Sequence, residues 1–235
     1  MSVFERLRLD GKKLFNTGGS RGLGREMALA IAEAGADVVL AGRSEESLQA
    51  TTEEIKQLGR AAFPITADIG NPEQCQEACQ RVVTEFGPID ILINNVGGRR
   101  ENILTEEMSL EKWRELMDLN LTSAFLCTRI VGATMIERGE GGKIVFISSV
   151  QAEMPIARCV AYGAAKAGLN HMMRTIAVEL SWAMISAERG CPVNSPISPT
   201  GMPGLMRTSS SPDAPMTRNC PFSRINISSL GSPNT

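Results

Sequence analysis

Tyr162 and Lys166 are two side chains in this sequence that together could transfer a proton. They are four residues apart, so on a helix they lie on one face, one above the other. A free phenol holds its proton too tightly to exchange it readily at neutral pH, and a fixed ammonium beside it favours the phenolate form. Tyr162 is therefore a candidate general acid or base. This spacing also arises by chance on many amphipathic helices, so the interpretation needs partners elsewhere in the chain.

Ser149 is a candidate partner for this pair, because it lies thirteen positions before Tyr162. It follows the apolar run 144–147, which is typical of a buried strand. A hydroxyl at the end of such a strand can donate a hydrogen bond to a substrate oxygen. The three side chains together indicate proton transfer at that oxygen.

A glycine-rich turn at 18–24 lies between a short strand predicted at 12–17 and an amphipathic helix. The apolar face of this helix is formed by Leu23, Met27, Ile31 and Ala34. Glycines at such a turn let the backbone approach a ligand closely. The helix N-terminus offers free N–H groups and the positive end of a dipole to phosphates. A glycine turn between a strand and a helix is much stronger evidence for a nucleotide site than glycines alone.

Strands and helices alternate along the rest of the chain. Further strands are predicted at 37–41, 61–66, 89–93 and 143–147. Helices are predicted at 45–58, at 72–86, from about 109 to 138, and around Tyr162 to about Leu180. The pattern predicts an α/β fold of the Rossmann type, with a doubly wound parallel sheet and helices on both faces.

Polar clusters lie where the predicted strands end. They are found at 17–24, 42–43, 68, 94–97 and 148–149. The carboxyl ends of parallel strands meet at one edge of a sheet, and ligands bind beyond that edge. This convergence is the main physical argument for a nucleotide site.

The composition disfavours several classes of protein. The 235 residues are 43% hydrophobic, enough for one sizeable core, and the net charge of −2 argues against nucleic-acid binding. No apolar run approaches the ~20 residues of a membrane span, and the first ten residues lack a signal-like apolar region. We therefore expect a cytoplasmic protein with reduced thiols and no membrane partner.

The positions of the cysteines and of the histidine disfavour a metal site. The chain has one histidine, His171, and six cysteines, at 75, 79, 127, 159, 191 and 220. Cys75 and Cys79 are one helical turn apart, but no second cluster of Cys or His completes a set of metal ligands. We expect neither a structural metal nor a His-based triad.

Several groups of residues resemble motifs of the short-chain dehydrogenases/reductases. The stretch 17–24, Thr-Gly-Gly-Ser-Arg-Gly-Leu-Gly, looks like the TGxxxGxG turn of this family. The stretch 94–97, Asn-Asn-Val-Gly, resembles its NNAG motif with valine for alanine. Its catalytic tetrad is matched in order and spacing by Asn120, Ser149, Tyr162 and Lys166. The resemblance covers residues 8–180, and the nearest members are 3-oxoacyl carrier-protein reductases and gluconate 5-dehydrogenase-like enzymes.

The resemblance implies hydride transfer between a nicotinamide and a carbonyl or secondary alcohol. Tyr162 would be the acid or base, and Lys166 would promote its ionisation and hold the nicotinamide ribose. Ser149 would orient the substrate oxygen. Asn120 would hold a water of the proton relay, at a distortion in the long helix. Asn120 could also be a plain amide on a helix surface.

The resemblance also implies a dinucleotide site. Its residues, in addition to Tyr162 and Lys166, are Gly18, Ser20, Arg21, Gly22, Leu23, Gly24, Arg43, Asp68, Ile69, Asn95, Val96 and Gly97. The second strand ends in Ala-Gly-Arg at 41–43, without the acid that would bind the ribose 2′-hydroxyl of NAD. Arg43 and Arg21 could pair with a 2′-phosphate, so we expect NADP(H) to be preferred over NAD(H). Each arginine could also be a solvated charge, and Asp68 a loop cap.

Arg99 and Arg100 follow two glycines at the expected mouth of the site. They could favour an anionic substrate, or they could simply be solvated. We expect a small-molecule carbonyl or alcohol as the substrate. By analogy with the family we also expect a homo-oligomer, if the C-terminal region permits it.

The sequence departs from the family in two places. Lys13 and Asn16 occupy the first strand, where the family has apolar residues, and they indicate an edge position or a local fault. After Leu180 the periodicity is lost, and eight of the twelve prolines follow. We therefore expect an NAD(P)-binding domain at 1–180 and an irregular Ser/Pro-rich tail at 181–235, with the last one or two strands of the sheet missing.

Two origins of this tail stay open. It could come from a shifted reading frame or an altered gene end, or it could be a divergent segment. Translation of the gene in its other two frames tests the first idea, which fails if neither frame restores the strand motifs of the family. The alternative function is accordingly an inactive or cofactor-binding-only relative with a damaged substrate region.

Overall fold

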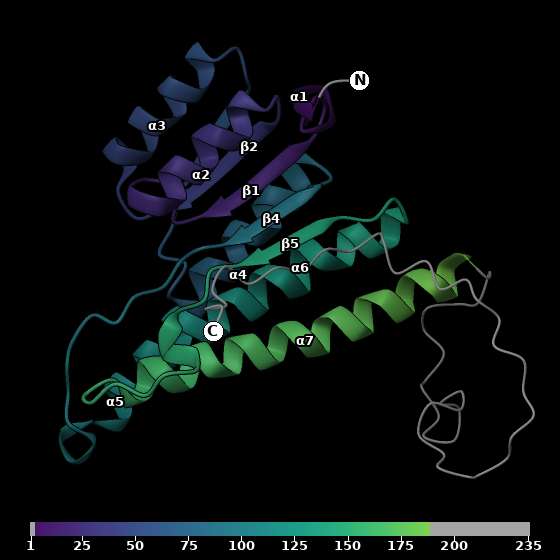
Figure 1. Ribbon diagram of the computed structural model, residues 1–235. Coiled ribbons are helices and arrows are strands. Elements are labelled where there is room, and N and C mark those ends of the chain that lie inside the picture. Colours follow the sequence, from purple (N-terminus) through teal and green to yellow (C-terminus); the bar gives the residue numbers. More distant parts are fainter. Residues whose placement is uncertain (1–2, 189–235) are drawn as a thin grey trace, which may run out of the picture.

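A sheet of five parallel strands forms the centre of this computed structural model, which describes residues 3–188 (Figure 1). The strands are β1 (Lys13–Thr17), β2 (Asp37–Gly42), β3 (Ala62–Thr66), β4 (Ile91–Asn94) and β5 (Lys143–Phe146). Their order, β3-β2-β1-β4-β5, places β1 in the middle. The chain winds outwards from β1 to β3 and then from β4 to β5. The sheet is therefore doubly wound, as predicted, with its switch point between β1 and β4.

The strands are covered on both faces, which explains their nearly continuous apolar sequence. Phe15 of β1 pairs with Val39 on one side and with Leu92 on the other, and all three side chains are buried. This register brings the carboxyl ends of β1, β2 and β4 to the same edge of the sheet.

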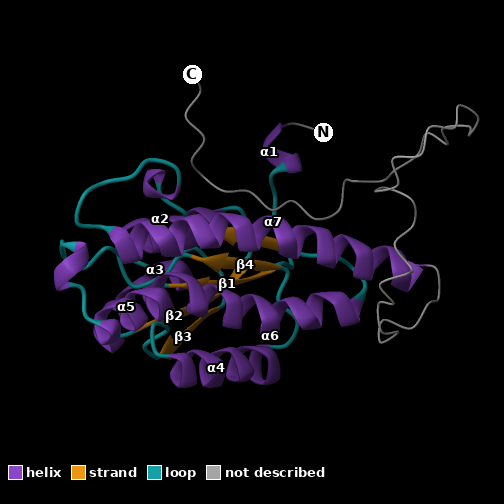
Figure 2. Cartoon of the chain, turned by 90° about the horizontal axis from the view of Figure 1, so that it is seen from below, coloured by secondary structure: helices purple, strands orange, loops and turns teal. Residues whose placement is uncertain are grey.

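The main helices form two layers, one on each face of the sheet (Figures 1 and 2). One layer contains α2 (Gly22–Glu33) and α3 (Glu45–Gln57). The other contains α4 (Pro72–Arg81), α6 (Ser123–Arg138) and α7 (Val160–Glu188). The remaining segments are α1 (Val3–Arg6), η1 (Val82–Phe86), η2 (Thr105–Glu107), α5 (Leu110–Met117), η3 (Asp118–Thr122) and η4 (Val150–Ala152).

The starts of three helices follow from their capping residues. Ser44, Asn71 and Ser109 each accept a hydrogen bond from the backbone N–H three residues later, and so cap α3, α4 and α5. Pro72 occupies the first turn of α4, where its missing N–H costs nothing.

The long helix predicted from about 109 to 138 is interrupted in the middle. The π-helical segment η3 separates α5 from α6. By length and composition, Leu110–Arg138 could cross a membrane, although no apolar run of that length was expected from the sequence. More than half of its apolar window is buried inside the fold, and α6 belongs to the main core cluster, so this is a core helix.

Lys13 and Asn16 have a different explanation from the one expected, because β1 is the central strand of the described sheet and not an edge. Asn16 is fully buried, and its Nδ2 donates a hydrogen bond of 2.7 Å to the carbonyl of Gly24. Lys13 is partly buried and donates from Nζ to the carbonyl of Phe86 at 2.5 Å. Asn16 therefore ties the end of β1 to the start of α2, while its Oδ1 has no partner among the described residues.

Helix α7 continues to Glu188, eight residues beyond its predicted end near Leu180. The other predictions for the tail, including the missing strands and the irregular segment, lie outside the described residues. Within residues 3–188, β3 and β5 are the edges of the sheet.

Candidate functional site

A cavity of about 750 Å³ lies beyond the carboxyl ends of β1, β2, β3 and β4. It is formed by the glycine turn and by the loops that follow the other three strands. The predicted dinucleotide residues that line it are Gly18, Ser20, Arg21, Leu23, Gly24, Arg43, Asp68, Ile69, Asn95, Val96 and Gly97. Gly22, Tyr162 and Lys166 belong to the same predicted set but do not line this cavity.

The glycine turn packs too closely against its surroundings to accept side chains. A Cβ on Gly24 would lie 2.1 Å from the carbonyl oxygen of Gly18. Gly18 has a φ of +73°, and a Cβ there would lie 2.8 Å from Nδ2 of Asn95. Nδ2 of Asn95 donates to the carbonyls of Thr17 at 3.0 Å and Gly18 at 3.2 Å, and so fixes the turn to the end of β4.

Thr17 completes this link between the two central strands. Its Oγ1 donates to the carbonyl of Ile93 at 3.2 Å and accepts from the backbone N–H groups of Asn95 and Val96. Asn94, one residue earlier, is buried and donates from Nδ2 to Oγ1 of Thr128 on α6 at 3.1 Å. Side-chain hydrogen bonds thus fix the carboxyl ends of β1 and β4 at the switch point.

The start of α2 points its free backbone N–H groups at this crevice. The residue before the helix, Arg21, has an extended backbone, and its side chain makes no capping hydrogen bond. The first N–H groups of a helix have no partner within the helix, and they carry a partial positive charge. The glycine turn and the start of α2, which together form a phosphate cradle, can therefore accept an anionic group such as a diphosphate.

Arg43 and Asp68 lie on the opposite wall, at the ends of β2 and β3. Nη1 of Arg43 lies 3.9 Å from Oδ2 of Asp68, and both side chains are about half exposed. Oδ1 of Asp68 accepts from the N–H of Gly70 at 3.0 Å, so the carboxylate also closes its own loop. Arg43 consequently presents a guanidinium to the cavity, with one weak ionic partner.

Asn120 lies in η3, where the helical distortion turns its amide toward the loop after β4. The side chain is buried. Its Oδ1 accepts from the N–H of Gly98 at 2.8 Å, and its Nδ2 donates to the carbonyls of Gly98 at 3.0 Å and Leu116 at 2.9 Å. Asn120 is therefore not a surface amide, since it fixes the position of the loop that lines the cavity.

Lys166 extends from α7 to the same loop. Its side chain is buried, and Nζ donates to the carbonyl of Ile147 at 2.9 Å. Burial lowers the pKa of Lys166 to about 8. A Cβ on Gly97 would lie 2.9 Å from Nζ of Lys166 and 2.9 Å from Oδ1 of Asn120. Both side chains thus lie close to Gly97, a residue of the cavity wall.

Tyr162 and Ser149 do not line the cavity. Tyr162 is half-buried in the first turn of α7, and the centre of its ring lies 5.9 Å from Nζ of Lys166. Ser149 precedes η4, which packs against α7, and its Oγ accepts from the N–H of Gln151 at 3.2 Å. The structure therefore places Lys166 near the ring of Tyr162, and it places both Lys166 and Asn120 close to Gly97.

Some residues of the cavity were missed in the sequence. They are Ser44, Ser47, Ala67 and Leu119. The cavity is also lined by Gly42, from the polar cluster at 42–43, and by Gly98 and Arg100, from the expected mouth of the site. Ser44 directly follows Arg43, and its hydroxyl lies 2.9 Å from that of Ser47 at the start of α3. The position of Ser44 as a helix cap after a strand was the available signal for this pair.

The two arginines after the glycines of this loop separate. Arg100 lines the cavity and has a φ of +61°. Nη1 of Arg99 instead lies 3.8 Å from Sγ of Cys159, near the start of α7. Of Arg99 and Arg100, it is therefore Arg100 that adds positive charge to the cavity.

Comparison with known proteins gives consistent matches over this region. Residues 12–202 match the family model described as short chain dehydrogenase, which extends the similarity beyond residue 180. The 3-oxoacyl-[acyl-carrier-protein] reductase of Synechocystis sp. is 37% identical over 179 residues, which cover 76% of this chain and 69% of that protein.

Two solved structures illustrate the structural likeness. A 7α-hydroxysteroid dehydrogenase complexed with NADH and 7-oxo glycochenodeoxycholic acid has a TM-score of 0.73 at 32% identity, covering 78% of this chain and 71% of that one. A putative NAD(P)-dependent gluconate 5-dehydrogenase from Beutenbergia cavernae, with bound NADP, has a TM-score of 0.71 at 30% identity, covering 75% and 70%.

Proposed function

The chain belongs to the short-chain dehydrogenase/reductase family of oxidoreductases, and we propose that it transfers a hydride between NADP(H) and a small carbonyl or secondary alcohol. The observation that carries this proposal is that Lys166 and Asn120 both lie close to Gly97, a residue of the wall of a cavity whose glycine turn excludes side chains. A buried amine beside a phosphate cradle supports this function.

The residues of the cavity fit a dinucleotide. The close approach of Gly24 to Gly18 excludes a side chain, so the backbone N–H groups at the uncapped start of α2 stay accessible to a diphosphate. Asp68, Ile69 and Val96 would border the adenine side. When bound, the nicotinamide supplies or accepts the hydride, while the protein supplies position and charge.

Tyr162 acts as the general acid or base in this proposal. A pKa of about 8 leaves the Lys166 amine mostly protonated at neutral pH, and its Nζ lies 5.9 Å from the centre of the Tyr162 ring. Ser149 orients the substrate oxygen. The Oδ1 of Asn120 accepts one hydrogen bond from the protein and has a second lone pair for a water of the proton relay.

Arg43 and Arg21 support a preference for NADP(H) over NAD(H). Both line the cavity, and the end of β2 carries no carboxylate for a ribose 2′-hydroxyl. Guanidinium groups suit the oxygens of a 2′-phosphate. One related structure holds NADH and another NADP, so the choice in this chain follows from its own residues.

The substrate in this proposal is small and anionic. Arg100 places a guanidinium at the cavity, and no acidic residue other than Asp68 lines the cavity in the described structure. We place the enzyme in the cytoplasm as a homo-oligomer, and the free thiols of Cys75, Cys79, Cys127 and Cys159 support a reducing compartment.

The proposal is tested by NADPH oxidation with the purified full chain and a panel of small ketones and oxo acids. We expect turnover, and we expect Tyr162→Phe to lower kcat by about 10²–10⁴-fold, the usual contribution of general acid–base catalysis. Tyr162→Phe should still bind NADPH, with a Kd raised by no more than about 10-fold, the value of one lost hydrogen bond. Cofactor binding without turnover on any substrate would support the cofactor-binding-only relative, and the absence of binding would reject both functions.

A further inference from the structure

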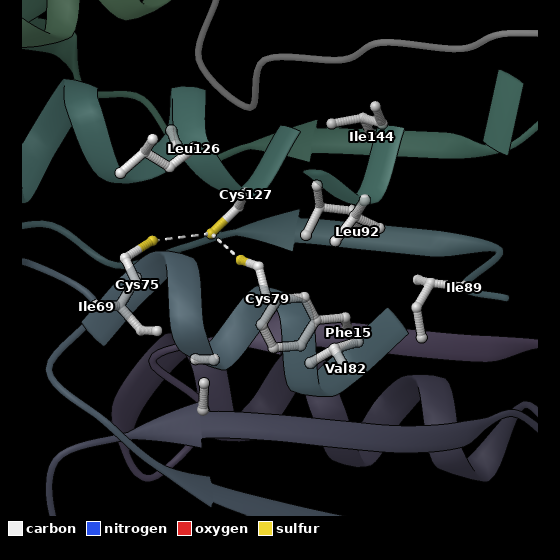
Figure 3. Close-up of a cluster of buried hydrophobic side chains, with 14 of the residues drawn as sticks. Phe15, Ile69, Cys75, Cys79, Val82, Ile89, Leu92, Leu126, Cys127 and Ile144 are labelled. Atoms are coloured by element: carbon white, nitrogen blue, oxygen red, sulfur yellow. Dashed lines mark hydrogen bonds between the residues drawn. The ribbon is translucent and has the colours of Figure 1, made fainter. Parts of the chain in front are cut away.

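Three cysteines outside the proposed active site lie together in the core (Figure 3). Cys75 and Cys79 belong to α4, and Cys127 belongs to α6. Sγ of Cys127 lies 3.6 Å from Sγ of Cys75 and 3.5 Å from Sγ of Cys79, and all three sulfurs lie within 4.8 Å of one another. All three are free thiols and fully buried.

The expectation of an incomplete metal set rested on the sequence positions alone. Cys127 is 48 residues from Cys79, and the packing of α6 against α4 brings its sulfur to the pair. The fold therefore brings a third sulfur next to the first two, although the spacing of the cysteines in the sequence gives no sign of this.

We propose that Cys75, Cys79 and Cys127 form a three-sulfur site for a soft, thiophilic metal ion, Cu(I). Two sides of the sulfur triangle measure 3.6 Å and 3.5 Å, and the third is at most 4.8 Å. A point equidistant from the three sulfurs then lies about 2.0–2.4 Å from each, a range that includes the metal–thiolate bond length of about 2.3 Å. An ion can therefore be bound with little movement of the helices.

The number of ligands favours Cu(I) over Zn²⁺. Structural zinc takes four ligands, and iron–sulfur clusters are held by four cysteines or by cysteines and histidines. Among residues 3–188, the ligand group at this position consists of the three cysteines alone. Thiolate sulfur selects Cu(I), Zn²⁺ and iron–sulfur clusters, and of these Cu(I) is the one that three ligands can satisfy.

The surroundings of the site are apolar. The sulfurs are surrounded by Phe15, Ile69, Val82 and Leu126, which provide no counter-charge (Figure 3). Thiolates are the ligands of a metal ion, so each coordinating thiol releases its proton to solvent as Cu(I) binds. The oxidation state of copper does not change. The choice of Cu(I) over Zn²⁺ therefore depends on the number of ligands and not on charge.

The test is a Cu(I) competition titration of the reduced full chain under anaerobic conditions, with the Cu(I)–bicinchoninate complex as the copper source. We expect the protein to remove one equivalent of Cu(I) from this complex. We expect the affinity for Cu(I) to fall by more than about 100-fold in each of the variants Cys75→Ala, Cys79→Ala and Cys127→Ala. Mutation of a residue that only supports a metal ligand already lowers metal affinity by up to about 100-fold, and loss of the ligand itself should cost more. A matched titration with Zn²⁺ should show no retained equivalent.

The control variants separate this site from other thiols. Cys159→Ala removes a buried thiol outside the cluster, and a Cys191→Ala/Cys220→Ala variant removes the two remaining thiols of the sequence. Both should keep the full Cu(I) affinity. Circular dichroism and melting temperature show whether each variant is folded, and Cu(I) should raise the melting temperature of the wild type.

The oxidation state and the ligands can also be measured on the wild type, without any substitution. X-ray absorption at the copper edge should show Cu(I) with three sulfur neighbours. A reduced wild type that leaves Cu(I) with bicinchoninate would overturn the proposal, and the cysteines would then be small apolar core residues. Binding that survives in a folded Cys127→Ala variant, or copper with fewer than three sulfur neighbours, would overturn it as well.

Discussion

Lys166 keeps its amine in the protein interior, where burial lowers its pKa from 10.5 to about 8. The unfolded chain therefore binds more protons than the folded chain between these two pH values. The free energy of unfolding must then rise with pH across this window, and the contribution of Lys166 must be constant below it. A shift of this size corresponds to roughly 3 kcal/mol.

Lys166→Met provides the measurement of this effect. The difference in free energy of unfolding, wild type minus variant, should be flat from pH 6 to 7.5 and should rise by on the order of 3 kcal/mol toward pH 10.5. Urea unfolding of the apo protein at several pH values gives this difference. The contributions of titrating groups far from Lys166 are the same in both proteins and cancel. A difference that stays flat, or that falls with pH, would show that burial does not lower the pKa of the Lys166 amine.

Arg43 provides the prediction for cofactor choice. Arg43→Ala should raise the Kd for NADPH by about 10- to 100-fold, the value of one hydrogen bond to a charged group, and should change the Kd for NADH by less than about threefold. Fluorescence titration of both dinucleotides measures the two constants. Arg129→Ala, an exposed arginine of α6 away from the cavity, is the matched control. Equal losses for both dinucleotides would contradict a contact with the 2′-phosphate.

Individual residues of the site could be predicted from the sequence where their type is required by the backbone. Gly18 and Gly24 are examples, because the turn leaves no space for a Cβ. Asn120 was predicted by its place in a set of motifs, but its three hydrogen bonds depend on the π-helical segment and could not be predicted. Cys127 shows the limit clearly, because only packing between helices relates it to Cys75.

At the scale of elements, the loop after β4 connects the cavity to α5, η3 and α7. Gly97→Ala would place a Cβ 2.9 Å from both Lys166 Nζ and Asn120 Oδ1. We expect a loss of about 1–3 kcal/mol in stability, typical of overpacking, together with a large loss of NADPH turnover. Urea unfolding and steady-state kinetics measure the two effects.

Gly98→Ala is the control for this prediction. A Cβ on Gly98 would meet nothing within 4 Å, and Asn120 bonds only to the backbone of that residue. This variant should be within about 0.5 kcal/mol of the wild type. If Gly97→Ala and Gly98→Ala have the same effect, the absence of a side chain at Gly97 is not what allows Lys166 and Asn120 to take their positions.

The elements themselves were largely predictable, since apolar runs and helical periodicity reflect the burial that forms them. β2 and β5 lie within one residue of their predicted bounds. β4 begins at Ile91, although Ile89 is equally apolar and buried, because pairing with β1 begins there. α7 passes its predicted end, and Asn16 is central rather than peripheral, because both outcomes depend on neighbouring elements.

At the scale of the whole molecule, the cofactor should stabilise the fold by mass action. NADPH at 100 times its Kd should add about 2.7 kcal/mol to the free energy of unfolding, which corresponds to roughly 5–10 °C in melting temperature for a chain of this size. Differential scanning fluorimetry with and without NADPH measures the shift, and NADH at the same concentration should give a smaller one. A melting temperature unaffected by either dinucleotide would mean that the cavity does not bind them.

The central position of β1 also has a consequence for the order in which the molecule is assembled. Its pairing with β2 joins residues that leave the ribosome soon after one another, whereas the pairing of Phe15 with Leu92 joins residues 77 positions apart. Non-local pairing of this kind is slow, because the chain must close a long loop before the contact forms. A nascent chain can therefore form β1, β2 and β3 early, but it carries only one wall of the crevice until β4 has been synthesised. Translational pausing just before residue 91 would prolong the lifetime of a half-sheet with an open strand edge, and so increase the time available for aggregation or chaperone capture.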